Sequence, residues 1–133
     1  SALPNVFYHG VFDSVANDAV SELSMYDLHL FPSKWAAEGV PGVLVETKMA
    51  AVPTVASNIN YNAELVESGK DGIVLDECTV EAMCDAIKAL DRDRELLASM
   101  KEAALASAEY FCVDRYLEEL VADLENGRKG ALR

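Results

Sequence analysis

The chain has 133 residues, of which 51% are hydrophobic, and its formal net charge is −12. This length suits one domain or a piece of a larger protein, and the apolar fraction is sufficient for a packed core rather than a disordered chain. Acidic residues outnumber basic ones by 23 to 11 without a basic patch, so nucleic acid is not an expected partner. No apolar run reaches the roughly 18 residues of a membrane span, and no signal-peptide pattern opens the chain.

The cysteines argue against a metal or disulfide framework. Cys78, Cys84 and Cys112 are odd in number and lack CxxC spacing, so we expect neither a zinc site nor disulfides, but small apolar packing groups in a reducing, cytoplasmic compartment. The triplet Asp-Arg-Asp at 91–93 resembles an acidic metal-binding motif, but it opens a predicted helix, which favours helix capping over metal binding.

Short apolar runs alternate with helical patterns in the first half of the chain. Strands are predicted at 5–10, 28–32, 53–57 and 72–75, and helices at 14–26, about 41–51 and 61–68, the first with Ser14 as its N-cap. This alternation implies right-handed βαβ units. The predicted fold is therefore α/β: a Rossmann-like parallel sheet of about four strands with helices on both faces.

From Thr79 onwards the pattern predicts helices only. Thr79 is the expected cap of a helix whose inward residues should be Val80, Met83, Cys84 and Ile87. Two further helices are predicted at 91–108 and about 113–125. The expected domain thus spans 1–125, with a disordered tail at 126–133.

Ligands of parallel sheets bind at the carboxyl ends of the strands, often at a helix N-terminus. The loops 9–10, 32–39 and 57–64 follow three predicted strands, so we expect them on one rim. His9 falls on this rim, although a structural role is the favoured interpretation for both His9 and His29.

The stretch EGVPGVLVE (38–46) lies in the middle of that rim. Pro41 suits the first position of a helix because its ring presets φ. Gly42 lets a ligand approach the backbone, and the amides of Gly42 and Val43 are potential donors at the positive end of the helix dipole. This arrangement favours a phosphate.

Two interpretations of Glu38 and Glu46 remain open from the residues alone. The first is that Glu38 acts on the helix end electrostatically and Glu46 is solvated. The second is that Glu46 accepts hydrogen bonds from sugar hydroxyls while Glu38 reaches over the rim. Asn62 and Glu64, at the start of the next helix, are rim candidates for which plain capping is the alternative.

The run from 28 to 75 resembles the C-terminal, nucleotide-sugar-binding domain of retaining GT-B-fold glycosyltransferases (glycosyl transferases group 1, family 4). The rest of the chain resembles it only loosely. The shared features are Pro-Ser after a strand, Glu-Gly, seven residues between two glutamates, a Pro-led strand ending in Ala-Ser, Asn-x-Glu, and a Gly-led strand. Pro-Gly after Glu-Gly, with Tyr-Asn-x-Glu downstream, is similar to the branch that makes capsular or exopolysaccharides.

The resemblance implies transfer of a sugar from a nucleotide sugar, such as a UDP- or GDP-sugar, to a glycan with retained configuration. It implies a catalytic contact of Glu38 with the donor sugar and a contact of Glu46 with the ribose. The diphosphate would lie near the backbone of 40–43, although Pro41 has no amide hydrogen to donate. Neither a metal nor another cofactor is implied. The full set of donor-site candidates is Ser33, Lys34, Gly39, Val40, Pro41, Gly42, Val43, Glu46, Asn62 and Glu64.

Several departures from the family pattern shape the expectation. A basic Arg and Lys pair, two βα units and the acceptor-binding N-terminal domain would all precede this sequence. We therefore expect a fragment that is inactive alone and self-associates through an uncovered sheet edge and apolar surface. The whole protein would bind a glycan or lipid-linked acceptor in the cytoplasm, at the inner face of the membrane. The family pattern also differs at three positions of the predicted helix: Thr47, Lys48 and Ala51. Glycine is usual in the family at position 51.

Two other classes of protein compete with this interpretation. A non-catalytic, flavodoxin-like α/β interaction or regulatory domain would explain the short, acidic chain without any chemistry. It gives no reason to place Glu38 and Glu46 around a helix start. An epimerase that shares the GT-B fold would be expected to carry a histidine-rich site, and the chain has only two histidines.

Overall fold

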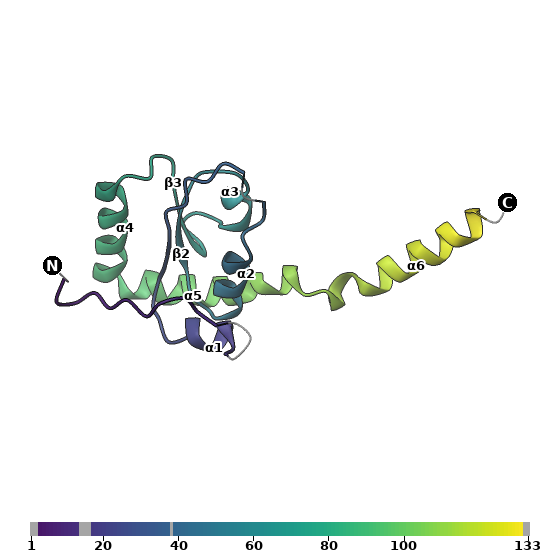
Figure 1. Cartoon of the computed structure of the whole chain (residues 1–133), viewed down its shortest axis with the longest axis horizontal. Helices are drawn as coiled ribbons and strands as arrows, with labels where there is room; N and C mark the ends of the chain where they lie inside the picture. The colour runs from purple at the N-terminus through teal and green to yellow at the C-terminus, as the bar shows by residue number, and fades with distance from the viewer. Residues whose placement is uncertain (1–2, 14–16, 38, 132–133) are drawn as a thin grey trace.

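The computed structural model describes residues 3–13, 17–37 and 39–131, with side chains as far as 126. Figure 1 shows the arrangement of its elements. In chain order they are α1 (Ala19–Leu23), β1 (His29–Phe31), α2 (Gly42–Met49), β2 (Thr54–Ser57), α3 (Asn62–Leu65), β3 (Gly72–Leu75), α4 (Val80–Arg92), α5 (Arg94–Ala108), a 3₁₀ turn (Glu109–Phe111) and α6 (Asp114–Ala131). The predicted α/β order with an all-helical C-terminal part is confirmed.

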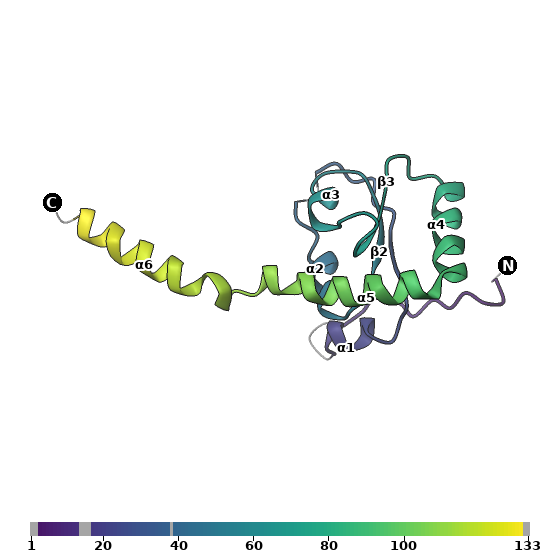
Figure 2. The same ribbon diagram turned by 180° about the vertical axis from the view of Figure 1, so that it is seen from behind.

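The described strands form one parallel sheet in the order β1-β2-β3, with His29 opposite Thr54 and Val55 opposite Ile73. Both crossovers advance the sheet in the same direction. Right-handed connections therefore place α2 and α3 on one face. The helix α4 lies on the other face, and α5 crosses beneath the sheet (Figures 1 and 2). The described residues form three strands, one fewer than predicted.

Each face of the sheet has its own hydrophobic cluster. On the α4 side, Val55 packs with Ala86, Leu90, Leu97 and Met100. The cluster on the α2 side consists of Leu44, Leu65 and Val66, with Phe31 and Val74 against it. Neighbouring residues of β3 contribute to opposite clusters because strand side chains alternate between faces.

Short polar side chains start three of the helices. Asp18 accepts hydrogen bonds from the amides of Val20 and Ser21 at α1. Thr79 caps α4 as predicted, and Asp93 caps α5 through the amide of Leu96. The capping role expected for the 91–93 triplet is therefore confirmed at Asp93. The predicted cap Ser14 lies outside the described residues.

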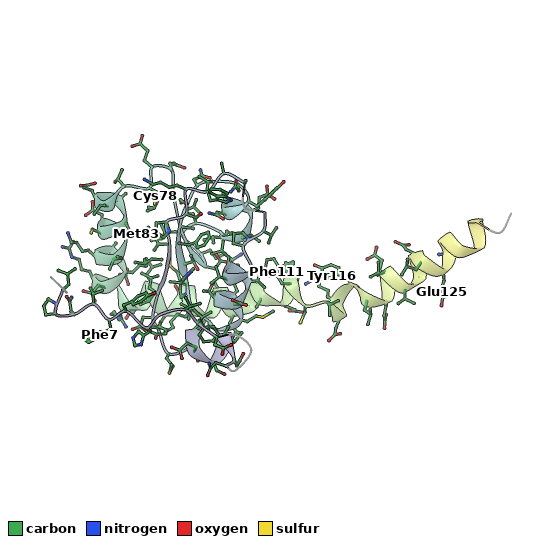
Figure 3. All side chains as sticks on the ribbon, in the orientation of Figure 1. Phe7, Cys78, Met83, Phe111, Tyr116 and Glu125 are labelled. Atoms are coloured by element: carbon green, nitrogen blue, oxygen red, sulfur yellow. The ribbon has the colours of Figure 1, made fainter. Side chains whose placement is uncertain are left out.

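The strand predicted at 5–10 is wrong. These residues have no strand conformation, and Val6 and Tyr8 are exposed. Phe7 is exposed as well (Figure 3). A strand needs hydrogen bonds to a neighbouring strand. Among the described strands, β1 pairs with β2 alone, and no strand lies on its other side. The apolar segment therefore leaves that edge of β1 unpaired and forms no strand.

The predicted inward face of α4 is wrong, because the helix buries a different set of residues from the one expected. Val80 is 76% exposed and Ile87 and Cys84 are also exposed, whereas Met83 packs against the core as expected. The buried residues of α4 are Ala86 and Leu90. The cysteines are not packed as predicted either, since Cys84 and Cys112 are exposed and Cys78 is half-buried.

The helix α6 extends away from the rest of the molecule (Figures 1 and 3). Its described apolar side chains are all exposed: Tyr116, Leu117, Leu120, Val121 and Leu124. The helix continues to Ala131 and so occupies most of the predicted disordered tail at 126–133. Residues 132 and 133 lie outside the described part of the chain.

Candidate functional site

Two of the loops predicted to form a rim meet at the carboxyl ends of the strands. Ser57 Oγ donates a hydrogen bond of 2.6 Å to the carbonyl of Ser33, and Asn60 Nδ2 donates one of 2.9 Å to the carbonyl of Trp35. Asn58 Nδ2 donates to Asp76 Oδ1 at 2.8 Å and so adds the loop after β3. These polar bonds fix the backbone at the end of the sheet where ligands of such folds bind.

A pocket of about 270 Å³ opens at this end of the sheet. Ser33 and Lys34 line it, together with Ser57, Asn58 and Asp76. Lys34 also lines a neighbouring pocket of about 290 Å³ toward Thr79 and Met83 of α4. Cys78 and Met83 mark this region in Figure 3. The pocket therefore combines one cation, Lys34, and one carboxylate, Asp76, with several neutral hydrogen-bonding groups.

The helix α2 starts within one residue of its predicted position. Pro41 is its buried N-cap, with φ −69° and ψ 114°, and no side chain caps the helix with a hydrogen bond. Gly42 is exposed, and a Cβ added there would meet no atom within 4 Å. The start of α2 is thus open to an approaching group. Gly39 and Val40 precede it and are exposed, whereas Glu38 lies outside the described residues.

A separate pocket of about 380 Å³ lies where α1 meets α2. Val43 and the half-buried Glu46 line it from α2, and Glu22 and Tyr26 line it from the region of α1. The other described lining residues are His9, Phe12, Ala19 and Leu23. The walls are mainly apolar with a few polar groups, which is typical of a small-molecule site.

One polar contact organises this α1–α2 pocket. The Tyr26 hydroxyl donates a hydrogen bond of 3.0 Å to Glu22 Oε1. This bond, and the charge of Glu22, raise the pKa of Tyr26 above its ordinary value. The hydroxyl thus favours one orientation of the Glu22 carboxylate through an exposed hydrogen bond.

The predicted site residues do not share one pocket. His9, Val43 and Glu46 meet at α1–α2, while Ser33 and Lys34 line the pocket at the strand ends. The described pockets therefore place His9 beside α2 and do not bring it together with the 32–39 and 57–64 loops.

Asn62 and Glu64 occupy different environments from each other. Asn62 is 1% exposed, and its Nδ2 donates to the carbonyl of Ser57 at 3.0 Å, so its amide serves the fold. Glu64 is exposed and lines a pocket of about 390 Å³ beside Lys48 and Asp71. Neither residue lines the α1–α2 pocket.

A buried ion pair beside the pocket of about 390 Å³ was not predicted. Lys48 Nζ contacts Asp71 Oδ2 and donates to Ser107 Oγ at 2.9 Å. The side chains of Lys48 and Asp71 are 5% and 4% exposed. The only sequence signal was a lysine where α2 otherwise presents buried residues, and its partner lies 23 positions away.

Two negative findings apply to the described residues. No group of three or more His, Cys, Asp and Glu side chains is placed to hold a metal ion. None of the described helices has the length and hydropathy needed to cross a bilayer.

Comparison with known proteins gives consistent matches. Residues 3–106 match the family described as "Glycosyl transferases group 1". The chain is 33% identical over 90% of its length to an exopolysaccharide phosphotransferase from Streptomyces coelicolor, of which it covers 14%. It is 34% identical over 68% of its length to an alpha-D-kanosaminyltransferase from Streptomyces kanamyceticus, of which it covers 23%. These named reactions differ, and the chain spans only a minor part of each relative.

Solved structures share the fold. HepE from Anabaena, in complex with UDP and glucose, matches 83% of this chain with a TM-score of 0.72 and 22% identity, over 30% of its own length. TarM matches 77% of the chain with a TM-score of 0.65 and 23% identity, over 20% of its length. These likenesses support a partial GT-B-type α/β domain.

Proposed function

Because the chain belongs to the glycosyl transferases group 1 family, we propose that it forms the donor-binding part of a retaining glycosyltransferase. The family match over 3–106 is the observation that carries this proposal. Such an enzyme would transfer a sugar from a nucleoside diphosphate sugar to a glycan or lipid-linked acceptor in polysaccharide synthesis. Family membership favours this function over a non-catalytic interaction domain.

The start of α2 is the proposed position of the diphosphate. The exposed Gly42 and the lack of a side-chain cap leave backbone donors of the first turn for a ligand. The positive end of the helix dipole favours an anion there. Gly39, Val40 and Val43 would shape the backbone around the phosphates, and Pro41 would direct the helix without donating a hydrogen bond.

The α1–α2 pocket is the proposed position of the nucleoside. Glu46 and Val43 both line it and lie within the first turns of α2. A carboxylate accepts hydrogen bonds only, so Glu46 suits the two ribose hydroxyls. Glu38 would contact the donor sugar near the reacting carbon. Ser33 and Lys34, at the strand ends, would face the sugar and phosphate side of the donor.

The proposed reaction requires stabilisation of the negative charge on the leaving nucleoside diphosphate. The leaving nucleoside diphosphate gains negative charge in the transition state, and preorganised donors and cations lower the barrier most. The chain carries a formal charge of −12, so its own field opposes an anionic ligand. Lys34 and the α2 dipole are therefore insufficient in this proposal, and further cations outside this sequence would be needed. No metal is required.

The proposal extends to the acceptor, the location and the association of the protein. The acceptor would be bound by a preceding domain, in the cytoplasm at the inner face of the membrane. The chain alone would be inactive and would self-associate through exposed apolar residues. These statements rest on the family resemblance and on the charge, and each is open to direct measurement.

Activity assays on the complete enzyme would test the proposal. Glu38→Gln and Glu46→Gln should each reduce sugar transfer severely while leaving the fold intact, because each removes a charged hydrogen-bond acceptor for the donor. Glu102→Gln, in the exposed part of α5, is the matched control and should keep normal turnover. Near-normal turnover of both Glu38 and Glu46 variants would refute the site assignment.

Calorimetry on the 133-residue chain tests the need for further cations. Titration with UDP and with GDP should show no binding in the micromolar range. Micromolar affinity would contradict the claim that the diphosphate needs basic groups beyond this sequence.

A further inference from the structure

We propose that Glu22 selects guanine as the nucleobase of the donor, so that a GDP-sugar is the substrate class. The inference rests on the proposed function, since it deepens the assignment of the α1–α2 pocket to the nucleoside. Its independent observations are the position of the Glu22 carboxylate in that pocket and the hydrogen bond that orients it.

The pocket offers two acceptor-only groups on neighbouring helices. Glu46 comes from α2 and Glu22 from α1, and both line the same cavity of about 380 Å³. That volume lies in the range of about 300–1,000 Å³ that is usual for small ligands. If Glu46 takes the ribose hydroxyls, Glu22 is the described carboxylate that remains in the pocket for the base.

The chemistry of the base edges decides between nucleotides. Guanine presents two adjacent donors, N1–H and the exocyclic N2 amine, which one carboxylate can accept together. Uracil presents one N–H flanked by two carbonyl oxygens, and these would face the carboxylate unfavourably. Adenine and cytosine each place a ring acceptor beside a single exocyclic amine. Guanine is therefore the common base that matches a carboxylate at two positions.

The Tyr26 hydroxyl leaves this capacity intact. A carboxylate has about four lone-pair positions, and the hydroxyl uses one of them on Oε1. The bond also reduces the rotational freedom that Glu22 would lose on binding. Phe12 and His9 add flat rings to the lining, on which a base can stack.

A ¹⁵N–¹H NMR titration of the 133-residue chain tests this proposal. GDP, IDP and UDP are each added up to millimolar concentrations, and their affinities are compared. IDP lacks only the exocyclic amine. We expect GDP to bind roughly tenfold more tightly than UDP, the discrimination typical of a two-point contact, with IDP between them. Glu22→Ala should reduce the GDP-to-UDP ratio below about twofold, and Tyr26→Phe should lower it partly. Removal of a negative charge favours binding of both anionic nucleotides. The ratio of their affinities, and not either affinity alone, is therefore decisive.

The exposed Glu102→Ala is the control and should keep the ratio of the unsubstituted chain. Equal binding of GDP and UDP, or a ratio that survives Glu22→Ala, would overturn the guanine assignment and leave the donor-binding proposal standing. If none of the three nucleotides binds at millimolar concentrations, the guanine assignment fails, and the donor-binding proposal is decided separately by the Glu38 and Glu46 variants of the complete enzyme.

Discussion

Lys48 and Asp71 form an ion pair that joins α2 to the turn before β3, with both side chains almost completely buried. Ser107 of α5 accepts a further hydrogen bond from Lys48 Nζ, and Asp71 Oδ1 accepts one from the amide of Glu67 at 2.8 Å. The pair therefore connects three elements around the helix that carries Glu46. This arrangement fixes the rotation of α2 about its own axis.

Removal of one member of the pair should destabilise the chain strongly. Lys48→Met leaves Asp71 buried without its counter-charge, which costs about 3–5 kcal/mol of unfolding free energy. The combined Lys48→Met and Asp71→Leu variant should lose less than either single change, because no unpaired charge stays buried. Urea unfolding monitored by circular dichroism measures the three variants. A loss in the double variant equal to the sum of the two single losses would show that the charges are not coupled.

Replacement of Ala51 by glycine should stabilise the fold. The amide of Ala51 donates to the carbonyl of Lys48 and that of Val52 to the carbonyl of Thr47, which is the Schellman pattern at the end of α2. Ala51 has φ +57°, a left-handed conformation that costs an L-residue about 1–2 kcal/mol. Ala51→Gly should raise the unfolding free energy by about 0.5–1 kcal/mol, once the greater entropy of unfolded glycine is subtracted. A loss of stability in urea unfolding would contradict this account.

The sequence predicted what depends on local patterns. The span of β3 is correct to the residue, Thr79 is the cap of α4, and α2 begins at the predicted Pro-Gly. The family resemblance marked position 51 as one where glycine is usual, and the positive φ of Ala51 agrees with that preference. These features follow from turn chemistry and capping, which act over a few neighbouring residues.

What the sequence could not supply were relations between distant residues. The apolar run 5–10 has strand composition, yet no neighbouring strand accompanies it in the described structure. The inward face of α4 is set by packing against β2 and α5, so small Ala86 is buried and Val80 is not. Asn62 is a rim candidate with plain capping as the alternative, and its hydrogen bond to the carbonyl of Ser57 was not predicted. For the same reason, the joining of Glu22 with Glu46 in one pocket needed the structure.

His29 should make stability depend on pH. Burial lowers the pKa of His29 below its ordinary value of 6.5, and its Nδ1 lies 3.2 Å from Thr54 Oγ1. The unfolded chain then binds more protons than the folded one between the lowered pKa and 6.5. Unfolding free energy should therefore be highest above pH 6.5 and fall as the pH decreases through that window.

Two substitutions check the assignment to His29. His29→Gln should flatten the pH dependence of urea unfolding between about pH 5 and 7, close to the ordinary histidine range. His9→Gln, at an exposed position, should keep the slope of the unsubstituted chain. A slope that persists in His29→Gln would assign the dependence to other groups.

The apolar side of α6 should cause self-association. Leu120 and Leu124 are 53% and 62% exposed on a helix that projects from the molecule (Figure 3). Contiguous exposed apolar residues of this kind favour association. Sedimentation velocity should show a weight-average mass that rises with concentration, and the combined Leu120→Glu and Leu124→Glu variant should remove that rise. Val80→Glu changes an apolar residue of α4 that is even more exposed, and it should leave association unchanged. A monomer at all concentrations would refute the prediction.

The central claim is that α2 holds a nucleoside diphosphate, with Gly42 and Val43 at the phosphates and Glu46 at the ribose. A ¹⁵N–¹H NMR titration of the chain with GDP and UDP tests it most directly, because amide shifts report the location even of weak binding. The proposed site predicts the largest shifts at the amides of 42–46 and an affinity about fivefold or more weaker in Glu46→Gln, since a charged acceptor is lost. Largest shifts elsewhere, or an unchanged affinity in Glu46→Gln, would contradict it.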